Sequence, residues 1–175
     1  SNYQKIAFCL VNDINIIDID GESRANISSE DDGLLRSPQF TPDGKKIIYS
    51  YIDGGGVNRD YYIMNIDGTD KTNITNGSVP NDIDMSGYKI SPDGTKILFY
   101  DWGDCYDIWI INIDGTGLTN LTNNRTTCDR YPDFSADGQK IVFTRDGVIH
   151  TMDSNGGSVT NLSVSGEYTL YSPSG

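Results

Sequence analysis

The chain has 175 residues and a mass of 19.3 kDa, so one domain spanning residues 1–175 is expected. Its 13 basic and 25 acidic residues give a net charge of −12. This charge argues against nucleic-acid binding, which depends on neutralising phosphates with Lys and Arg, and it disfavours an anionic membrane surface. No run of about 18 apolar residues is present for membrane insertion. The charge favours cationic or neutral partners, such as glycans, unless it serves only solubility.

One phrase occurs three times along the chain, as a Pro-Asp-Gly or Ala-Asp-Gly turn followed by a short apolar run. The copies lie at residues 37–49, 89–99 and 131–143. A second phrase containing Asp-Gly or Asn-Gly follows each copy. Self-similarity at a period of roughly 40–50 residues, with turn dipeptides between short apolar runs, is typical of propellers and repeat arrays.

The third full repeat gives the clearest reading of the strands. They are expected at residues 131–135, 140–144, 148–152 and 159–163. Asp-Gly and Asn-Gly connect them, and these dipeptides favour type I′ turns, which need positive φ at both central residues. No amphipathic helix pattern is found. The sequence therefore predicts an all-β fold, a β-propeller of four-stranded antiparallel blades.

Each end of the chain carries half a repeat. Residues 4–8 match the half that follows the turn, and residues 170–175 match the half that precedes it. The C-terminal strand is therefore expected to complete the first blade by pairing beside residues 5–9, which leaves no open edge at the seam. Four repeats predict either a four-bladed ring in one chain or half of an eight-bladed homodimer.

The repeat phrases resemble a known family. Residues 91–99 read Ser-Pro-Asp-Gly-Thr-Lys-Ile-Leu-Phe, residues 108–116 read Ile-Trp-Ile-Ile-Asn-Ile-Asp-Gly-Thr, and residues 121–123 read Leu-Thr-Asn. This pattern covers nearly the whole chain and resembles the TolB-like, WD40-like repeats of bacterial β-propellers. The resemblance implies a non-enzymatic binding module of a bacterial envelope or secreted protein, in the periplasm or outside the cell. Familiar members usually carry more blades than this chain supplies.

Motifs of enzyme chemistry are not found: the sequence has no Gly-x-Ser-x-Gly elbow, no His-Glu-x-x-His and no Gly-rich phosphate loop. The single histidine, His150, falls at a regular position of the third strand, so an ordinary strand side chain is expected. Residues 18–21 suggest a calcium loop, but Ile27 stands where the loop needs a bidentate Glu. No metal and no cofactor are therefore expected.

An aspartate recurs just before the third strand of three repeats. These residues are Asp13, Asp60 and Asp107. They either line an axial channel and hold a cation or cap the loop by accepting bonds from backbone amides. Glycosylation sequons also recur in the fourth strand, which weakens glycosylation as their explanation. They begin at Asn26, Asn73, Asn120 and Asn161.

Residues that break the repeat are the better candidates for function, because repeat residues build the scaffold. On the loops expected at one face, the proposed binding residues are Arg59, Asp101, Trp102, Arg130 and Tyr131. Loops on a rigid scaffold favour ligand sites, and Trp, Tyr and Arg favour interfaces. A protein or glycan partner is expected, although Trp102 and Tyr131 could instead only plug the channel mouth.

A second function class uses acidic residues at the same mouth. Asp101, Asp104 and Asp129 could act as paired carboxylates of a glycan-active hydrolase or lyase. No motif in the chain supports such an enzyme, so the binding module is favoured.

The three cysteines are too few for a disulfide scaffold. Cys9 lies within an apolar strand and is expected to be an inert thiol. Cys105 and Cys128 lie in loops that propeller topology brings to one face, so they are expected to be close enough to bridge. A bridge would imply an oxidising compartment.

Overall fold

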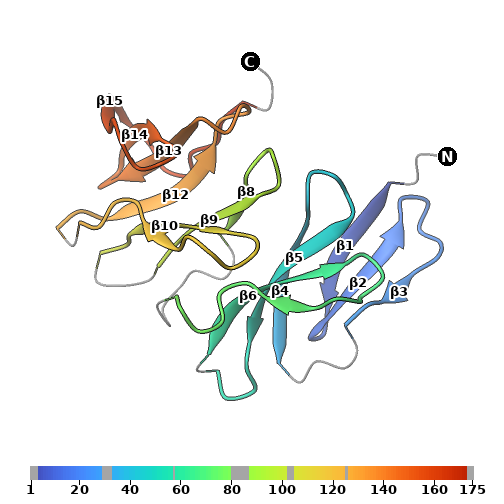
Figure 1. Ribbon diagram of the computed structural model, residues 1–175. Coiled ribbons are helices and arrows are strands. Elements are labelled where there is room, and N and C mark those ends of the chain that lie inside the picture. Colours follow the sequence, from blue (N-terminus) through green and yellow to red (C-terminus); the bar gives the residue numbers. More distant parts are fainter. Residues whose placement is uncertain are drawn as a thin grey trace. The chain divides into compact units, whose positions relative to one another are not determined.

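The computed structural model describes residues 4–28, 33–56, 58–79, 87–101, 105–124 and 126–172. Every helix or strand assigned in this part of the chain is a β-strand, which confirms the all-β prediction (Figure 1). The chain divides into two compact units, Ser1–Asn81 and Asp82–Gly175. Each unit contains two sheets and is described by itself. The single domain expected over residues 1–175 stays a prediction.

The first unit holds one sheet of three strands and one of four, each in sequence order. The three-stranded sheet contains β1 (Lys5–Leu10), β2 (Asp13–Asp18) and β3 (Ala25–Asn26). The four-stranded sheet contains β4 (Leu34–Phe40), β5 (Lys46–Ile52), β6 (Arg59–Asn65) and β7 (Thr72–Asn73). All neighbouring strands are antiparallel, so each sheet is a simple meander joined by hairpin turns.

The second unit holds two four-stranded antiparallel meanders. The first contains β8 (Lys89–Ile90), β9 (Lys96–Tyr100), β10 (Ile108–Asn112) and β11 (Thr119–Asn120). The second contains β12 (Asp129–Phe134), β13 (Lys140–Arg145), β14 (Val148–Asp153) and β15 (Thr160–Ser165). These last four strands lie where the repeat predicts them. The three full repeats therefore form the four-stranded propeller blades that the sequence predicts.

The apolar runs of the repeat become strands buried on both faces. In β5 the consecutive residues Ile47, Ile48 and Tyr49 are all buried, and the same holds for Ile97, Leu98 and Phe99 in β9. Strands covered on both sides read as continuous apolar runs rather than as an alternating pattern.

The single histidine is part of this packing. His150 is 7% exposed, and its ring stacks on Phe143 at 5.6 Å, as expected of an ordinary strand side chain.

The turns after the first strand of each blade are not the predicted type I′. In the turn at residues 41–44, the amide of Gly44 donates to the carbonyl of Thr41 at 2.8 Å. Gly44 has φ of +69°, whereas Asp43 is not among the residues with positive φ. Pro42 favours a type I turn, because proline fixes φ near −65°. Proline is not required, however, since the turn at residues 135–138 has the same bond, from the Gly138 amide to the Ser135 carbonyl at 2.8 Å, with Ala136 at that position. The β13–β14 hairpin does have both residues at positive φ, Asp146 at 48° and Gly147 at 78°.

The recurring aspartate caps the outer loop of its blade. In the second sheet, Asp60 Oδ1 accepts bonds from the Thr75 hydroxyl at 2.6 Å and the Gly77 amide at 2.8 Å. Its Oδ2 accepts a bond from the Asn73 side-chain amide at 3.0 Å. Of the two alternatives for this aspartate, the cap is the one that the structure shows at Asp60.

Asp107 repeats these contacts in the third sheet. It accepts bonds from the Thr122 hydroxyl at 3.1 Å, the Asn124 amide at 3.0 Å and the Asn120 side chain at 2.8 Å. Asp13 accepts the equivalent bond from Asn26 at 2.7 Å. The Asn-x-Ser/Thr pattern thus recurs because its amide and hydroxyl tie the fourth strand to the aspartate.

The described strands do not include the expected pair between the C-terminal strand and β1. β1 pairs with β2 on one side, and no other described strand is its partner. Leu170 and Tyr171 are not in a strand, and the amide of Tyr171 donates to Asp133 Oδ2 at 3.1 Å. Residues 173–175 lie outside the described residues. The pairing of the C-terminal strand with residues 5–9, and with it the blade count, stays a prediction.

Removing the cap should destabilise the first unit. Asp60→Ala leaves the hydroxyl of Thr75 and the amide of Gly77 without their acceptor, so the free energy of unfolding should fall by about 2–4 kcal/mol. Urea denaturation followed by circular dichroism measures this change. Glu22→Ala, at an exposed position, should change it by no more than about 0.5 kcal/mol. Equal stability of the two variants would show that the cap contributes nothing.

The turn aspartates should make the fold sensitive to acid. Bonds from the hydroxyls of Thr41 and Ser91 lower the pKa of Asp43 and Asp93, respectively, and the Ser135 hydroxyl lowers that of Asp137. Because the folded state holds these protons more weakly than the unfolded chain, their stabilisation is present above about pH 4 and is lost as pH falls through the lowered folded pKa values.

Urea denaturation at pH 7 and pH 3 tests this linkage. The wild-type protein should lose stability at pH 3, and Asp93→Asn should lose less, because one of the linked carboxylates is gone. A variant that loses as much as the wild-type protein would contradict the assignment to Asp93.

Candidate functional site

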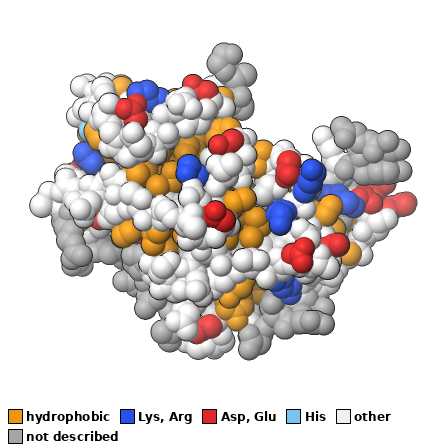
Figure 2. Space-filling model, viewed as in Figure 1, with side chains coloured by type: hydrophobic (Ala, Val, Ile, Leu, Met, Phe, Trp, Pro, Cys, Tyr) orange, Lys and Arg blue, Asp and Glu red, His pale blue; other side chains and the backbone are white. Residues whose placement is uncertain are grey.

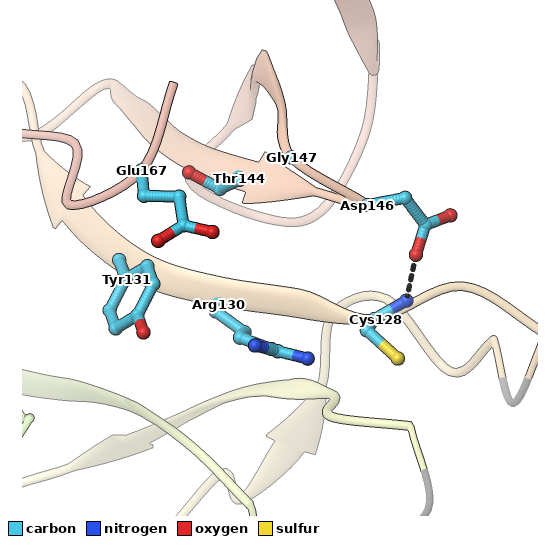
Figure 3. Close-up of a pocket in the computed structure, with 7 residues that line it drawn as sticks. All are labelled: Cys128, Arg130, Tyr131, Thr144, Asp146, Gly147 and Glu167. Atoms are coloured by element: carbon cyan, nitrogen blue, oxygen red, sulfur yellow. Dashed lines mark hydrogen bonds between the residues drawn. The ribbon is translucent and has the colours of Figure 1, made fainter. Parts of the chain in front are cut away.

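A pocket of about 280 Å³ opens beside β12 in the second unit (Figure 3). Its lining residues are Cys128, Arg130, Tyr131, Thr144, Asp146, Gly147 and Glu167. Two of them, Arg130 and Tyr131, belong to the predicted binding residues. In Figure 3, Glu167 extends from the segment after β15 toward the strand that carries both. The pocket thus offers a cation, a carboxylate and an aromatic ring within one hollow.

Arg130 is held against an aromatic ring. Its guanidinium carbon lies 4.1 Å from the centre of the Tyr106 ring, a cation–π contact. Its Nε is buried and has no hydrogen-bond partner among the described residues. Burial lowers the pKa of Arg130, but the Cys128 thiol and the Tyr106 hydroxyl outweigh it and raise the pKa overall. The guanidinium therefore stays charged at the pocket wall.

Tyr131 occupies a β-bulge. Its φ is 53°, and the register of β12 on β13 shifts between Arg130 and Asp133. The ring stacks on Tyr168 at 4.3 Å and meets the edge of Tyr100 at 5.7 Å. A hydrogen bond with Tyr168, followed by burial, raises the pKa of Tyr131. The bulge thus turns a large ring toward the segment that follows β15.

Arg130 does not break the repeat, contrary to the sequence-based expectation. Arg36 lies at the same position of β4, since it pairs with Ser50 as Arg130 pairs with Thr144. Tyr131 does break it, because Ser37 stands at the equivalent bulge with φ of 51°. The surroundings differ as well, since the Arg36 guanidinium donates to the Leu35 carbonyl at 2.8 Å.

Of the proposed binding residues, Arg130 and Tyr131 line the pocket together. Asp101 closes the β9–β10 loop, where Oδ1 accepts the Asp107 amide at 2.7 Å and Oδ2 accepts the Trp109 indole at 3.1 Å. Trp102 lies outside the described residues. Arg59 begins β6 in the first unit, opposite Ile52. Their membership of one site with Arg130 and Tyr131 stays a prediction.

The carboxylates of the alternative enzyme are held in structural contacts. Asp129 is fully buried and accepts two bonds from Arg145, at 2.7 Å from Nε and 2.8 Å from Nη2. Both oxygens of Asp101 also have donors, as described above. Asp104 lies outside the described residues. In the described part of the chain, no group of three or more His, Cys, Asp or Glu side chains lies close enough to hold a metal ion.

The two loop cysteines lie side by side. Cys105 and Cys128 are not joined by a disulfide, and their Sγ atoms are 2.9 Å apart. Cys128 also lines the pocket. Proximity of these thiols to the Arg130–Tyr106 contact was not foreseen from the sequence.

A second hollow lies in the first unit and was also not foreseen. It has a volume of about 680 Å³ and lies between the start of β1 and the turn that follows β4. Repeat residues line it, including Phe40, Thr41 and Pro42, together with the exposed Ile6 and Ile19. The sequence pattern does not single out Phe40, Thr41 and Pro42 as binding residues, because the equivalent positions of the other repeats build the scaffold.

The surface charge forms no single acidic patch on the face shown in Figure 2. Asp and Glu side chains lie dispersed there among Lys, Arg and polar groups. No helix in the described residues is long and apolar enough to cross a membrane.

Two neighbouring arginines should differ sharply in their contribution to stability. Arg145→Met strands the buried carboxylate of Asp129 and should lower the free energy of unfolding by about 3–5 kcal/mol. Arg130→Met removes a cation–π contact and should cost no more than about 1–2 kcal/mol. Urea denaturation of both variants checks the difference. If Arg130→Met is the more damaging change, Arg130 is a structural residue.

Comparison with known proteins shows which known folds the chain resembles. No family model matches the chain, and no curated protein matches it. Among solved structures, the chain is similar to one described as TolB from Agrobacterium tumefaciens, with 26% identity and a TM-score of 0.67. That match covers 92% of this chain and 62% of the other.

Two further structures share the fold. TolB from Acinetobacter baumannii matches with 26% identity and a TM-score of 0.67, over 94% of this chain and 42% of that one. An oligogalacturonate lyase in complex with manganese matches with 12% identity and a TM-score of 0.67, over 86% and 47%. The chain thus spans less than two thirds of the length of either TolB structure. In its recurring turn phrases and four-stranded meanders, the chain is similar to TolB-like β-propeller proteins.

Proposed function

We propose that the chain is a non-enzymatic binding module that holds a protein partner at the pocket around Arg130 and Tyr131. The observation that carries this proposal is the charged guanidinium on the Tyr106 ring beside the Tyr131–Tyr168 stack, at the wall of a hollow. Arg and Tyr are enriched among the residues that dominate binding energy at interfaces. Trp102 and Arg59 remain in the proposed surface on sequence grounds, and Asp101 shapes the loop that leads to Trp102.

The chemistry of the pocket suits a peptide segment. A guanidinium can donate to a carboxylate or to backbone carbonyls, and stacked rings offer flat apolar surface. Glu167 adds an acceptor for a cationic group of the partner. A peptide of either charge could bind despite the net negative charge of the chain, because the pocket contains both a positive and a negative side chain.

The enzyme alternative has less support. A glycosidase needs two carboxyl groups that are open to the substrate, whereas Asp129 is buried against Arg145. The oligogalacturonate lyase and the puromycin hydrolase found among the similar structures are 12% and 15% identical to this chain, so they support the fold only. A glycan-active hydrolase or lyase thus stays the second candidate, and a glycan stays a second class of partner.

The proposed location is the bacterial envelope or the exterior of the cell. The similarity to two TolB structures supports it, together with the repeat pattern. An eight-bladed homodimer and a four-bladed ring are both compatible with four repeats. Solution mass distinguishes them.

Arg130→Ala and Tyr131→Ala should abolish partner binding while leaving the fold intact. Immobilised protein is incubated with a bacterial envelope extract, and retained proteins are quantified by mass spectrometry. A partner retained by the wild-type chain should be lost from both variants, because each removes one of the two anchoring side chains. Arg36→Ala is the matched control, since it changes the equivalent arginine of the first unit and should retain the partner.

Two results would overturn the proposal. Retention of the same proteins by all three variants would place binding elsewhere on the chain. Hydrolysis or elimination of an oligosaccharide by the purified protein, lost in Asp129→Asn with the fold intact, would favour the enzyme instead. Circular dichroism of each variant excludes unfolding as the cause of lost binding.

A further inference from the structure

Cys105 and Cys128 lie on two backbones that already run together. Their sulfur atoms are 2.9 Å apart, although 23 positions separate them in the sequence. One residue beyond each cysteine, the amide of Asp129 donates to the carbonyl of Tyr106 at 2.9 Å. A disulfide needs backbones that approach closely with their side chains facing each other. These two segments satisfy both requirements in the folded chain.

The backbone at Cys128 is held by the β13–β14 turn. Its amide donates to Asp146 Oδ1 at 2.9 Å, and its carbonyl accepts the Asp146 amide at 3.1 Å. The loop that carries Cys105 is closed at its base by the Asp101 carboxylate, which accepts the amide of Asp107. The two thiols therefore meet because both segments are anchored, and a bond between them requires little movement of the backbone.

We propose that Cys105 and Cys128 form an intramolecular disulfide by exchange with an external low-molecular-weight disulfide, and that this bond locks Tyr106 against Arg130. The thiolate of one cysteine attacks the external disulfide and releases one external thiolate, which takes up the proton that the cysteine lost. The second cysteine then attacks the mixed disulfide and releases the other external thiol in the same way. The two protein thiols are oxidised, and the external disulfide is reduced to two thiols.

The bond acts on the pocket through the neighbours of the two cysteines. Tyr106 directly follows Cys105, and Arg130 lies two positions after Cys128. Without the bond, the contacts between these segments are non-covalent and include the backbone hydrogen bond from Asp129 to Tyr106 and the cation–π contact of 4.1 Å. With it, the loop before β10 and the start of β12 are joined covalently. The bond thereby holds the backbone of Tyr106 close to that of Arg130 and keeps the ring beside the guanidinium.

Cys9 provides an internal comparison. It lies in β1 of the first unit and is half-buried, and burial raises the pKa of its thiol above the usual range. A thiol with a raised pKa is less often a thiolate, so it exchanges more slowly. Cys9 should therefore stay reduced under conditions that oxidise the other two.

The test uses the full folded chain incubated with oxidised glutathione and then alkylated under denaturing conditions. Mass spectrometry should find one alkylated cysteine, Cys9, and a linked peptide pair containing Cys105 and Cys128 that has lost two hydrogens. Cys105→Ser should give no linked pair. Alkylation of all three cysteines, or a link that includes Cys9, would overturn the proposal.

A second measurement tests the lock itself. In the oxidised protein, the Asp129 amide should exchange with deuterium more slowly than in the reduced protein, because the loop that supplies its acceptor can no longer open. The melting temperature should rise by roughly 5–10 °C, as expected for a bond that closes a loop of this length. An oxidised protein with unchanged exchange and unchanged melting would show that the bond leaves the Tyr106–Arg130 contact as it was. Neither measurement depends on the binding partner. The disulfide proposal can therefore fail while the proposed function holds, and the reverse.

Discussion

The buried carboxylate at the start of the third strand holds the outer part of each capped blade in place. The outermost strands β3, β7 and β11 are two residues long, so their ladders supply few hydrogen bonds. Around Asp60, one carboxylate gathers a threonine hydroxyl, a backbone amide and an asparagine side chain from the segment that follows β6. Buried polar groups must be paired, so each of these donors depends on the others being in place. The cap therefore fixes both the outer strand and the loop that leaves the blade, and the short strand offers little exposed edge for unwanted pairing.

The fourth repeat shows what happens when this carboxylate is missing. Val148 stands at the position of Asp107, so Asn161 keeps only the bond that its side chain accepts from the amide two residues later, Ser163, which the asparagines of the capped blades also make. The outer strand β15 is six residues long, and all six are exposed. Main-chain pairing with β14 thus replaces the side-chain cluster. Leu162 and Val164 remain 46% and 52% exposed, so the last blade keeps an uncharged, partly apolar edge that the capped blades lack.

The repeat predicts the fold well because equivalent strands of each blade bury the same types of residue. The period, the strand positions and the absence of helices could all be read from the turn phrases and the apolar runs. The turn type could not be read from Asp-Gly alone, because the glycine is the fourth residue of each turn and not one of its two central residues, as the bond from the Gly44 amide to the Thr41 carbonyl shows. The candidate site was harder to predict than the fold, because it depends on contacts between segments that are distant in the sequence. The nearness of Cys105 to Cys128 could be predicted, because propeller topology brings their two loops to one face, whereas the pairing of Asp129 with Arg145 does not follow from the spacing of these residues, since it requires the register of β12 on β13.

Register also decides why two arginines on adjacent strands take different roles. Asp129 lies directly opposite Arg145 in the β12–β13 ladder, so the carboxylate and the guanidinium meet where the chain excludes water. Arg130 is one residue further along and lies opposite Thr144, which offers no carboxylate. Its guanidinium turns to the ring of Tyr106 instead and remains at the wall of the pocket. Because the Asp129 amide also bonds to Tyr106, the buried ion pair fixes the backbone on which the aromatic support of Arg130 rests. The structural arginine thereby positions the one proposed to bind.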